Sequence, residues 1–188
     1  HGIADVLFGA YNPSGKLPMS FPRHTGQLPL YYSQKNTGRP GPSTDDVFWT
    51  HYTDSPNSPL YPFGFGLSYT QFDYSEITLS ANSIAVDESL EVSVTLTNSG
   101  ERDGVEIAQL YIRDLIGSIT RPVKELKGFE RVALKAGESK KVTFTLGPKT
   151  LGFYNTNGEY LVEAGDFEVF VGGDSDASVT AAFSATAD

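Results

Sequence analysis

Leu90–Thr97 reads LEVSVTLT, and this stretch decides the fold of the chain. Its apolar residues alternate with polar ones, so one face of a β-strand lies in a core and the other in water. The alternation recurs at residues 77–79, 108–112, 142–146 and 167–171. The sequence therefore predicts several half-buried strands in this part of the chain.

Turn signals separate these strands at residues 98–100, 136–138 and 165–166. Asn157-Gly158 predicts a hairpin with a two-residue turn, because both residues tolerate a positive φ. About seven short strands over roughly 110 residues favour a two-sheet sandwich of the immunoglobulin or fibronectin type III kind. We therefore expect a mostly β protein, with the sandwich spanning residues 72–188.

The chain opens on an apolar face, Ile3–Phe8, that stops at Gly9. This pattern predicts the last turns of a helix with a left-handed glycine cap. A Pro-Ser-Gly turn and a short strand over Lys16–Phe21 should follow, with prolines at its boundaries. Because a domain rarely begins with the end of a helix, we expect the chain to be the tail of a longer protein.

Residues 30–71 combine prolines and glycines with many aromatic side chains. Disordered linkers are poor in aromatics, so we expect a long loop pinned to a surface. Tyr and Trp faces stack on sugar rings, which makes Phe48, Trp49, His51 and Tyr52 candidates for ligand contact. The alternative is that the rings only anchor the loop, and we favour it for Tyr61, Phe63, Phe65 and Tyr69.

Composition excludes several classes of function. The net charge of the 188 residues is −9, and no basic run offsets it, so neither nucleic acid nor a membrane surface is an expected partner. Without cysteine there is no disulfide or thiolate site. His1, His24 and His51 are not spaced like metal ligands, and we expect no metal and no cofactor. Carboxylates are plentiful, but none stands out as a tuned acid or base.

Several longer motifs occur in order along the chain. They are ADVLFG (4–9), YNPSGKLP (11–18), NTGRP (36–40), YPFGFGLSYT (61–70), VTLTNSG (94–100), QLY (109–111), RPVKELKGF (121–129) and GDFEVFVG (165–172). On these motifs, nearly the whole chain resembles the C-terminal portion of glycoside hydrolase family 3 β-glucosidases of the bacterial periplasmic type.

The resemblance implies a three-part assembly of a barrel, an α/β sandwich and a fibronectin type III-like domain. Residues 1–29 would be the end of the α/β sandwich, 30–71 the connecting loop and 72–188 the fibronectin-like domain. The family retains anomeric configuration with an Asp nucleophile and a Glu acid/base, both upstream of this region. We therefore expect no catalytic residue in this chain, and no activity from the chain alone.

The expected function is the non-catalytic, supporting part of a retaining β-glucosidase that hydrolyses terminal β-D-glucosyl residues of oligosaccharides and glucosides. Expected partners are the upstream barrel and α/β-sandwich segments and a β-glucoside or cello-oligosaccharide, with a homodimer kept open. The expected location is the periplasm or the outside of a bacterial cell. Substrate-proximal candidates are Arg39, Trp49, His51 and Tyr52. The alternatives are a free-standing fibronectin-like module that binds carbohydrate or protein, and the tail of a β-xylosidase.

Overall fold

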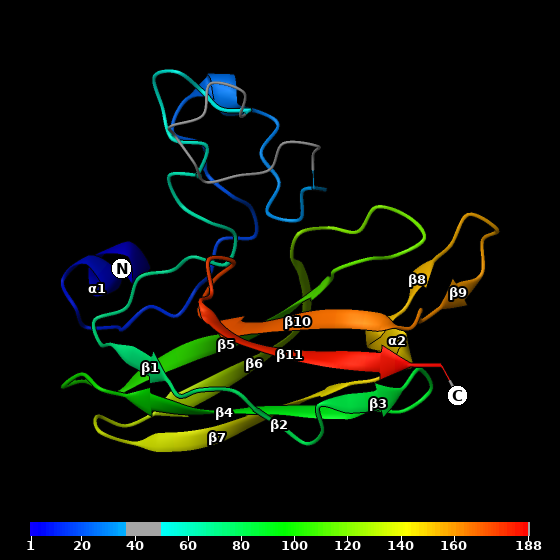
Figure 1. Cartoon of the computed structure of the whole chain (residues 1–188). Helices are drawn as coiled ribbons and strands as arrows, with labels where there is room; N and C mark the ends of the chain where they lie inside the picture. The colour runs from blue at the N-terminus through cyan, green and yellow to red at the C-terminus, as the bar shows by residue number, and fades with distance from the viewer. Residues whose placement is uncertain (37–49, 188) are drawn as a thin grey trace.

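The computed structural model of the chain describes residues 1–36 and 50–187. Two β-sheets pack face to face into a sandwich whose first strand begins at Phe72. The preceding residues form a short helix and long connecting segments that lie against one end of the sandwich and project beyond it (Figure 1). The prediction of a mostly β protein built on a two-sheet sandwich is therefore confirmed.

The first sheet is built around β4 (Leu90–Asn98). On one side β4 pairs with β7 (Ser139–Leu146), and on the other with the short strands β1 (Phe72–Tyr74) and β2 (Thr78–Leu79), all antiparallel. Leu90, Val92, Val94 and Leu96 are all buried, as their alternation predicts. Ser93 is buried as well; Thr78 of the paired strand β2 lies opposite it, and the Ser93 hydroxyl donates to the carbonyl of Thr78 (3.4 Å).

The second sheet has the order β3-β11-β10-β5-β6. Its strands are β3 (Ser83–Ala85), β5 (Gly104–Asp114), β6 (Glu125–Leu134), β10 (Gly165–Gly172) and β11 (Val179–Thr186). All neighbours are antiparallel except β11 and β3, which run parallel with Ser184 opposite Ser83. Leu110 faces Gly128 and Tyr111 faces Leu126, so Lys127 is the extra residue of a bulge in β6.

The core lies between the two sheets. Apolar side chains from both inner faces form one cluster, which includes Leu96, Leu110, Ile112, Phe144, Phe167 and Val169. Phe167 stacks on Phe183, with ring centroids 5.1 Å apart. Helix α2 (Pro148–Leu151) adds the buried Leu151. The sandwich therefore has a contiguous core of its own.

Helix α1 spans Gly2–Leu7, and Gly9 takes a φ of 77°. The prediction of a helix that ends on a left-handed glycine is therefore confirmed. No residue of Gly2–Leu7 is buried in the described structure, and Ile3, Leu7 and Phe8 are exposed.

The strand predicted over Lys16–Phe21 is wrong. The backbone bends at Pro18 and Met19, and only a single bridge joins Phe21 to Tyr61, with further backbone hydrogen bonds between Leu17 and residues 64–65. The physical reason is the prolines: Pro18, Pro22 and Pro62 lack the N–H groups that a continuous ladder needs. The segment is thus held by scattered bonds.

The hairpin at Asn157-Gly158 exists, but with a different turn. Strands β8 (Phe153–Tyr154) and β9 (Tyr160–Leu161) pair, and the N–H of Asn155 still bonds the carbonyl of Glu159 (3.0 Å). Three residues therefore form the loop, and only Gly158 has a positive φ, of 79°. The Asn155 side chain accepts from the N–H groups of Asn157 and Glu159, which favours this longer loop over the predicted two-residue turn.

Candidate functional site

Two of the four predicted site residues lie in the described part of the chain. Tyr52 donates its hydroxyl to the carbonyl of Gly26 (3.2 Å), and its ring meets His24 edge to face, 5.6 Å between centroids. His51, its exposed neighbour, lies in the same loop. Arg39 and Trp49 lie outside the described residues. His51 and Tyr52 are neighbours in the sequence, so their proximity says nothing about a site, and all four residues stay candidates for substrate contact.

A buried amide holds this loop in shape. Gln27, at the end of the 3-10 helix η1 (Thr25–Gln27), is only 2 % exposed. Its Oε1 accepts from the N–H of Arg23 (2.6 Å), and its Nε2 donates to the carbonyls of Pro56 (2.9 Å) and Ser58 (3.3 Å). We call residues 23–28 and 50–58 the loop cluster. It projects away from the sandwich (Figure 1).

Aromatic rings dock the following segment, residues 61–66, onto the sandwich. Phe63 stacks on Tyr32 with centroids 4.2 Å apart, and Tyr32 meets the fully buried Tyr111 edge to face at 5.9 Å. The Tyr111 hydroxyl donates to Gln109 Oε1 (2.6 Å). Burial raises the pKa of Tyr111 well above its usual value, so this hydroxyl stays a donor at neutral pH.

Gln109 completes the contact from the sandwich side. Its Nε2 donates to the carbonyls of Gly64 (3.2 Å) and Gly173 (2.5 Å). Gly64 has a φ of 80°, and a Cβ at that position would lie 2.2 Å from Gln109 Oε1. Residue 64 must therefore be glycine for two reasons: its backbone angle is positive, and the Gln109 side chain fills the space that a Cβ would need.

Lys124 fastens the tip loop between β10 and β11. Its ammonium donates to the carbonyls of Ser175 (2.8 Å) and Ala177 (3.1 Å) and lies 4.2 Å from the centre of the Phe170 ring. Burial lowers the pKa of Lys124, while Asp176 and Asp174 oppose that shift. The N–H of Ser175 in turn donates to the carbonyl of Phe63 (2.8 Å), which links the tip loop to residues 61–66.

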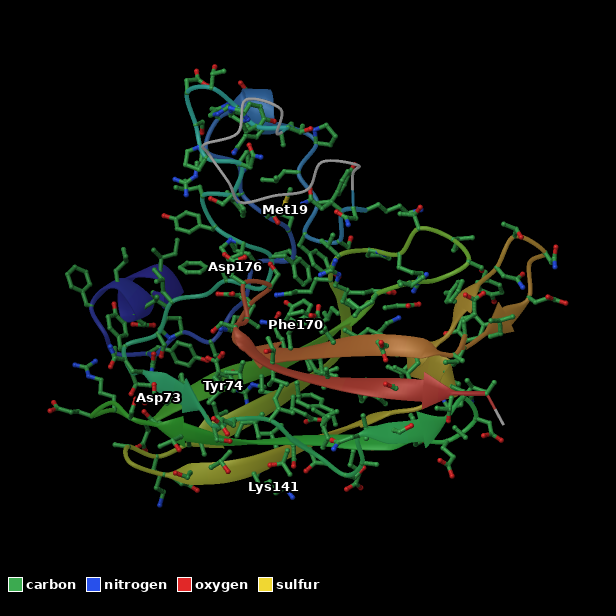
Figure 2. All side chains as sticks on the ribbon, in the orientation of Figure 1. Met19, Asp73, Tyr74, Lys141, Phe170 and Asp176 are labelled. Atoms are coloured by element: carbon green, nitrogen blue, oxygen red, sulfur yellow. The ribbon has the colours of Figure 1, made fainter. Side chains whose placement is uncertain are left out.

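Glu106 is the carboxylate that most resembles a tuned acid. It is 6 % exposed, and burial raises its pKa, opposed by Lys16 and by the Tyr74 hydroxyl. Lys16 Nζ lies 2.9 Å from its Oε1, and Tyr74 donates to the same oxygen (3.3 Å). Figure 2 labels Tyr74 on β1, beside the sheet that carries Glu106. The group is enclosed at the junction with residues 15–16 and thus serves as a support.

Sequence reasoning missed Glu106 and Gln109. Both lie on β5, which is buried on both faces, so the alternation at residues 108–112 does not show that its polar residues are enclosed; the only signal is a polar residue inside a long apolar run. Over residues 1–36 and 50–187, no group of three or more His, Asp or Glu side chains is arranged to hold a metal ion. None of the helices in these ranges has the length and apolar character needed to cross a membrane.

Two sequence-family models match the chain. Residues 1–69 match the glycosyl hydrolase family 3 C-terminal domain, and residues 106–175 match the fibronectin type III-like domain. The chain belongs to glycoside hydrolase family 3. It corresponds to the C-terminal part of the β-glucosidases of that family, as the resemblance of its motifs implies.

Relatives within family 3 carry two enzyme names. A periplasmic β-glucosidase of Salmonella typhimurium is 51% identical over 93% of this chain and 23% of its own length. A β-xylosidase of Formosa agariphila is 44% identical over 93% of this chain and 23% of its own length. The chain therefore spans about a quarter of the length of these family 3 enzymes.

A solved family 3 structure has the same fold over nearly the whole chain. The β-glucosidase of Listeria innocua in complex with glucose superposes with a TM-score of 0.92, at 46% identity, over 97% of this chain and 26% of that one. The described part of the chain therefore has the fold of the corresponding quarter of that β-glucosidase.

Proposed function

We propose that this chain is the non-catalytic, supporting part of a retaining β-glucosidase that hydrolyses terminal β-D-glucosyl residues of oligosaccharides and glucosides. The observation that carries the proposal is the match along nearly the whole chain to β-glucosidases, at 51% identity in the Salmonella protein. The glucose complex of the Listeria enzyme supports glucose as the sugar. The competing substrate is a β-xyloside, favoured by the 44% identity to the Formosa β-xylosidase.

The catalytic carboxylates belong, in this proposal, to segments upstream of residue 1. Glycosidase chemistry of this kind needs two carboxyl groups about 5 Å apart, both open to the sugar. In the described part of the chain, the carboxyl group with the strongest burial, Glu106, is enclosed by Lys16 and Tyr74. The chain alone is therefore inactive in this proposal, and its contribution is structural.

The upstream segments are the proposed partner, and the exposed apolar face of α1 supports this. Ile3, Leu7 and Phe8 are all exposed, together with Tyr11 nearby. A contiguous apolar patch on a protein surface marks a contact site.

We propose that the chain divides into residues 1–29, 30–71 and 72–188, and the start of the first strand at Phe72 agrees with the last boundary. A homodimer is a further partner proposal, which light scattering on the complete enzyme measures.

We propose that Arg39, Trp49, His51 and Tyr52 lie near the substrate, the last two as members of the loop cluster. Support comes from Tyr52, which contacts Gly26 and His24 and is thereby held on a loop that projects from the sandwich.

We propose a periplasmic or secreted location, in line with the name of the Salmonella relative. The alternative to a supporting part of a β-glucosidase is a free-standing fibronectin-like module that binds carbohydrate or protein.

Complementation tests the proposal. The 188-residue chain is assayed for hydrolysis of aryl-β-glucosides and aryl-β-xylosides, alone and mixed with separately produced upstream segments. We expect no turnover from the chain alone, turnover from the mixture, and a preference for the glucoside. Turnover by the chain alone would overturn the non-catalytic role, and a preference for the xyloside would overturn the substrate. If the upstream segments are equally active with and without the chain, the supporting role is overturned and the free-standing module is favoured.

A further inference from the structure

A cavity of about 320 Å³ lies where the aromatic-rich segments meet the tip of the sandwich. Three parts of the chain line it: residues 20 and 30–34 with 57–59, residues 123–124 before β6, and residues 175–176 in the tip loop. Figure 2 labels Asp176 on this loop, on the side of the sandwich that faces the segment carrying Met19. Neither the helix α1 nor the core contributes to its walls.

The walls of the cavity are bonded to one another. The N–H of Val123 donates to the carbonyl of Gln34 (2.9 Å), and an isolated bridge joins Lys35 to Pro122. Lys124 holds the tip loop through the carbonyls of Ser175 and Ala177. These bonds hold residues 34–35, 122–124 and 175–177 together, so this part of the lining is arranged before any ligand enters.

The lining groups select a neutral, hydroxyl-rich ligand. Tyr31 is 66 % exposed and offers a ring face, and Leu30 and Pro59 add apolar surface. Gln34 offers an amide and Asp176 a carboxylate, whereas the amide of Asn57 is engaged by the backbone of Thr50 and Tyr52. Two donors of the Lys124 ammonium are already directed at backbone carbonyls. The carboxylate of Asp176 would therefore repel an anionic ligand, and Lys124 would offset that repulsion only weakly. A neutral sugar can instead stack on the Tyr31 ring and form hydrogen bonds with the polar groups.

The volume sets the size of that ligand. Small-molecule sites range over roughly 300–1,000 Å³, so this cavity lies at the lower end. One six-membered sugar ring suits it better than a longer oligosaccharide. We propose that this cavity binds a single pyranose unit of a neutral saccharide, with Tyr31 against the ring face and Asp176 and Gln34 bonded to its hydroxyls.

Titration of the intact 188-residue chain with glucose and with cellobiose tests this site, read by backbone amide NMR. We expect saturable shifts at Gln34, Ser58, Val123 and Asp176, with a Kd in the millimolar range. Tyr31→Ala should weaken binding about tenfold, because the stacking surface is lost. Asp176→Asn should weaken it several-fold, and glucose 6-phosphate should bind more weakly than glucose.

Matched controls separate binding from folding. Tyr154→Ala removes an exposed tyrosine from β8, and Asp73→Asn an exposed carboxylate from β1, which Figure 2 labels away from Asp176. Both should leave the Kd unchanged, and thermal melts should show all four variants folded. Absence of saturable shifts, or equal losses in controls and site variants, would overturn the site. Since the measurement is binding to this chain, its failure is distinguishable from failure of the complementation assay.

Discussion

Lys16 Nζ lies 2.9 Å from Oε1 of Glu106 and joins the segment before the aromatic loop to strand β5. The two side chains are 17 % and 8 % exposed, so water screens the pair weakly. Tyr74 donates to the same carboxylate oxygen (3.3 Å). A buried pair of this kind contributes little net stability when both charges are present, but removing one partner leaves the other uncompensated.

Lys16→Met should lower the free energy of unfolding by about 2 kcal/mol at neutral pH, because Glu106 loses its cation and a charge-assisted hydrogen bond. Glu106→Gln should cost less than the loss of Lys16, about 1 kcal/mol, because the amide oxygen still accepts from Lys16 and Tyr74 and the charge left behind, on Lys16, is the more exposed of the two (17 % against 8 %). Urea denaturation at pH 7 measures both. A larger loss in the Gln variant than in the Met variant would contradict this account.

The pH dependence of stability should also identify Glu106. Burial raises its pKa above the ordinary 4.5, so the folded chain holds this proton more tightly than the unfolded chain. Its contribution is complete below pH 4.5 and is lost as the pH rises through the raised pKa. The stability of wild type relative to Glu106→Gln should therefore fall across that window.

Urea denaturation at several pH values, with Glu91→Gln on the exposed face of β4 as the control, measures this difference. A wild-type advantage that instead grew with pH would mean that the attraction of Lys16 outweighs burial.

Gly64→Ala should destabilise the junction more than its backbone angle alone explains. Gly158 has nearly the same φ, 79° against 80°, but no atom lies within 4 Å of a Cβ added there. Gly158→Ala should thus cost about 1–2 kcal/mol from backbone strain. Gly64→Ala should cost more, because the new methyl also displaces the Gln109 side chain. Equal losses in denaturant melts would show that the Gln109 contact is not tight.

Phe167→Ala should lower the free energy of unfolding by about 3–5 kcal/mol, because its ring is 1 % exposed and stacks on Phe183. Phe129→Ala is the matched control: its ring is largely exposed on β6, and its loss should lie within about 0.5 kcal/mol. Thermal and urea melts compare the two. A loss of less than about 1 kcal/mol for Phe167→Ala would show that this ring does not contribute to the core.

Trp49→Ala, made in the complete enzyme, should raise KM more than it lowers Tm, because we propose that Trp49 contacts the sugar. Tyr52→Phe, which keeps the ring but removes the hydroxyl bond to Gly26, is the comparison within the same loop. Steady-state kinetics and melts measure both effects. An unchanged KM for Trp49→Ala would contradict sugar contact and favour the alternative that the Trp49 ring only anchors the loop.

The sequence predicted the parts of the fold that depend on simple periodicity. The alternation in β4 and the glycine that ends α1 each follow from the properties of single residues, and both are confirmed. Strand β6 lacks a clean alternation, because Phe129 is exposed and a bulge shifts its pairing with β5. Strand β11 is rich in small residues, which give a weak apolar signal. Neither strand was identified individually.

The candidate site was less predictable, because its residues act through contacts far apart in the sequence. Glu106 meets Lys16 across 90 positions, and Gln109 meets Gly64 across 45. No local pattern encodes such pairs, since each depends on how the loop segments dock on the sandwich. The aromatic content of residues 30–71 did indicate the docking itself, which Tyr32, Phe63 and Tyr111 carry out.

The parallel pairing of β3 with β11 has a consequence for biosynthesis. The hydroxyl of Thr186 bonds the carbonyl of Ile84, 102 residues earlier, at the edge of the second sheet. A ribosome therefore releases β3 long before the strand that completes its edge has been made. Closure of such a distant contact is slow compared with hairpin formation. Strand β11 is thus the last strand of the sandwich to be synthesised, and a nascent chain stalled before it exposes an unfinished sheet edge.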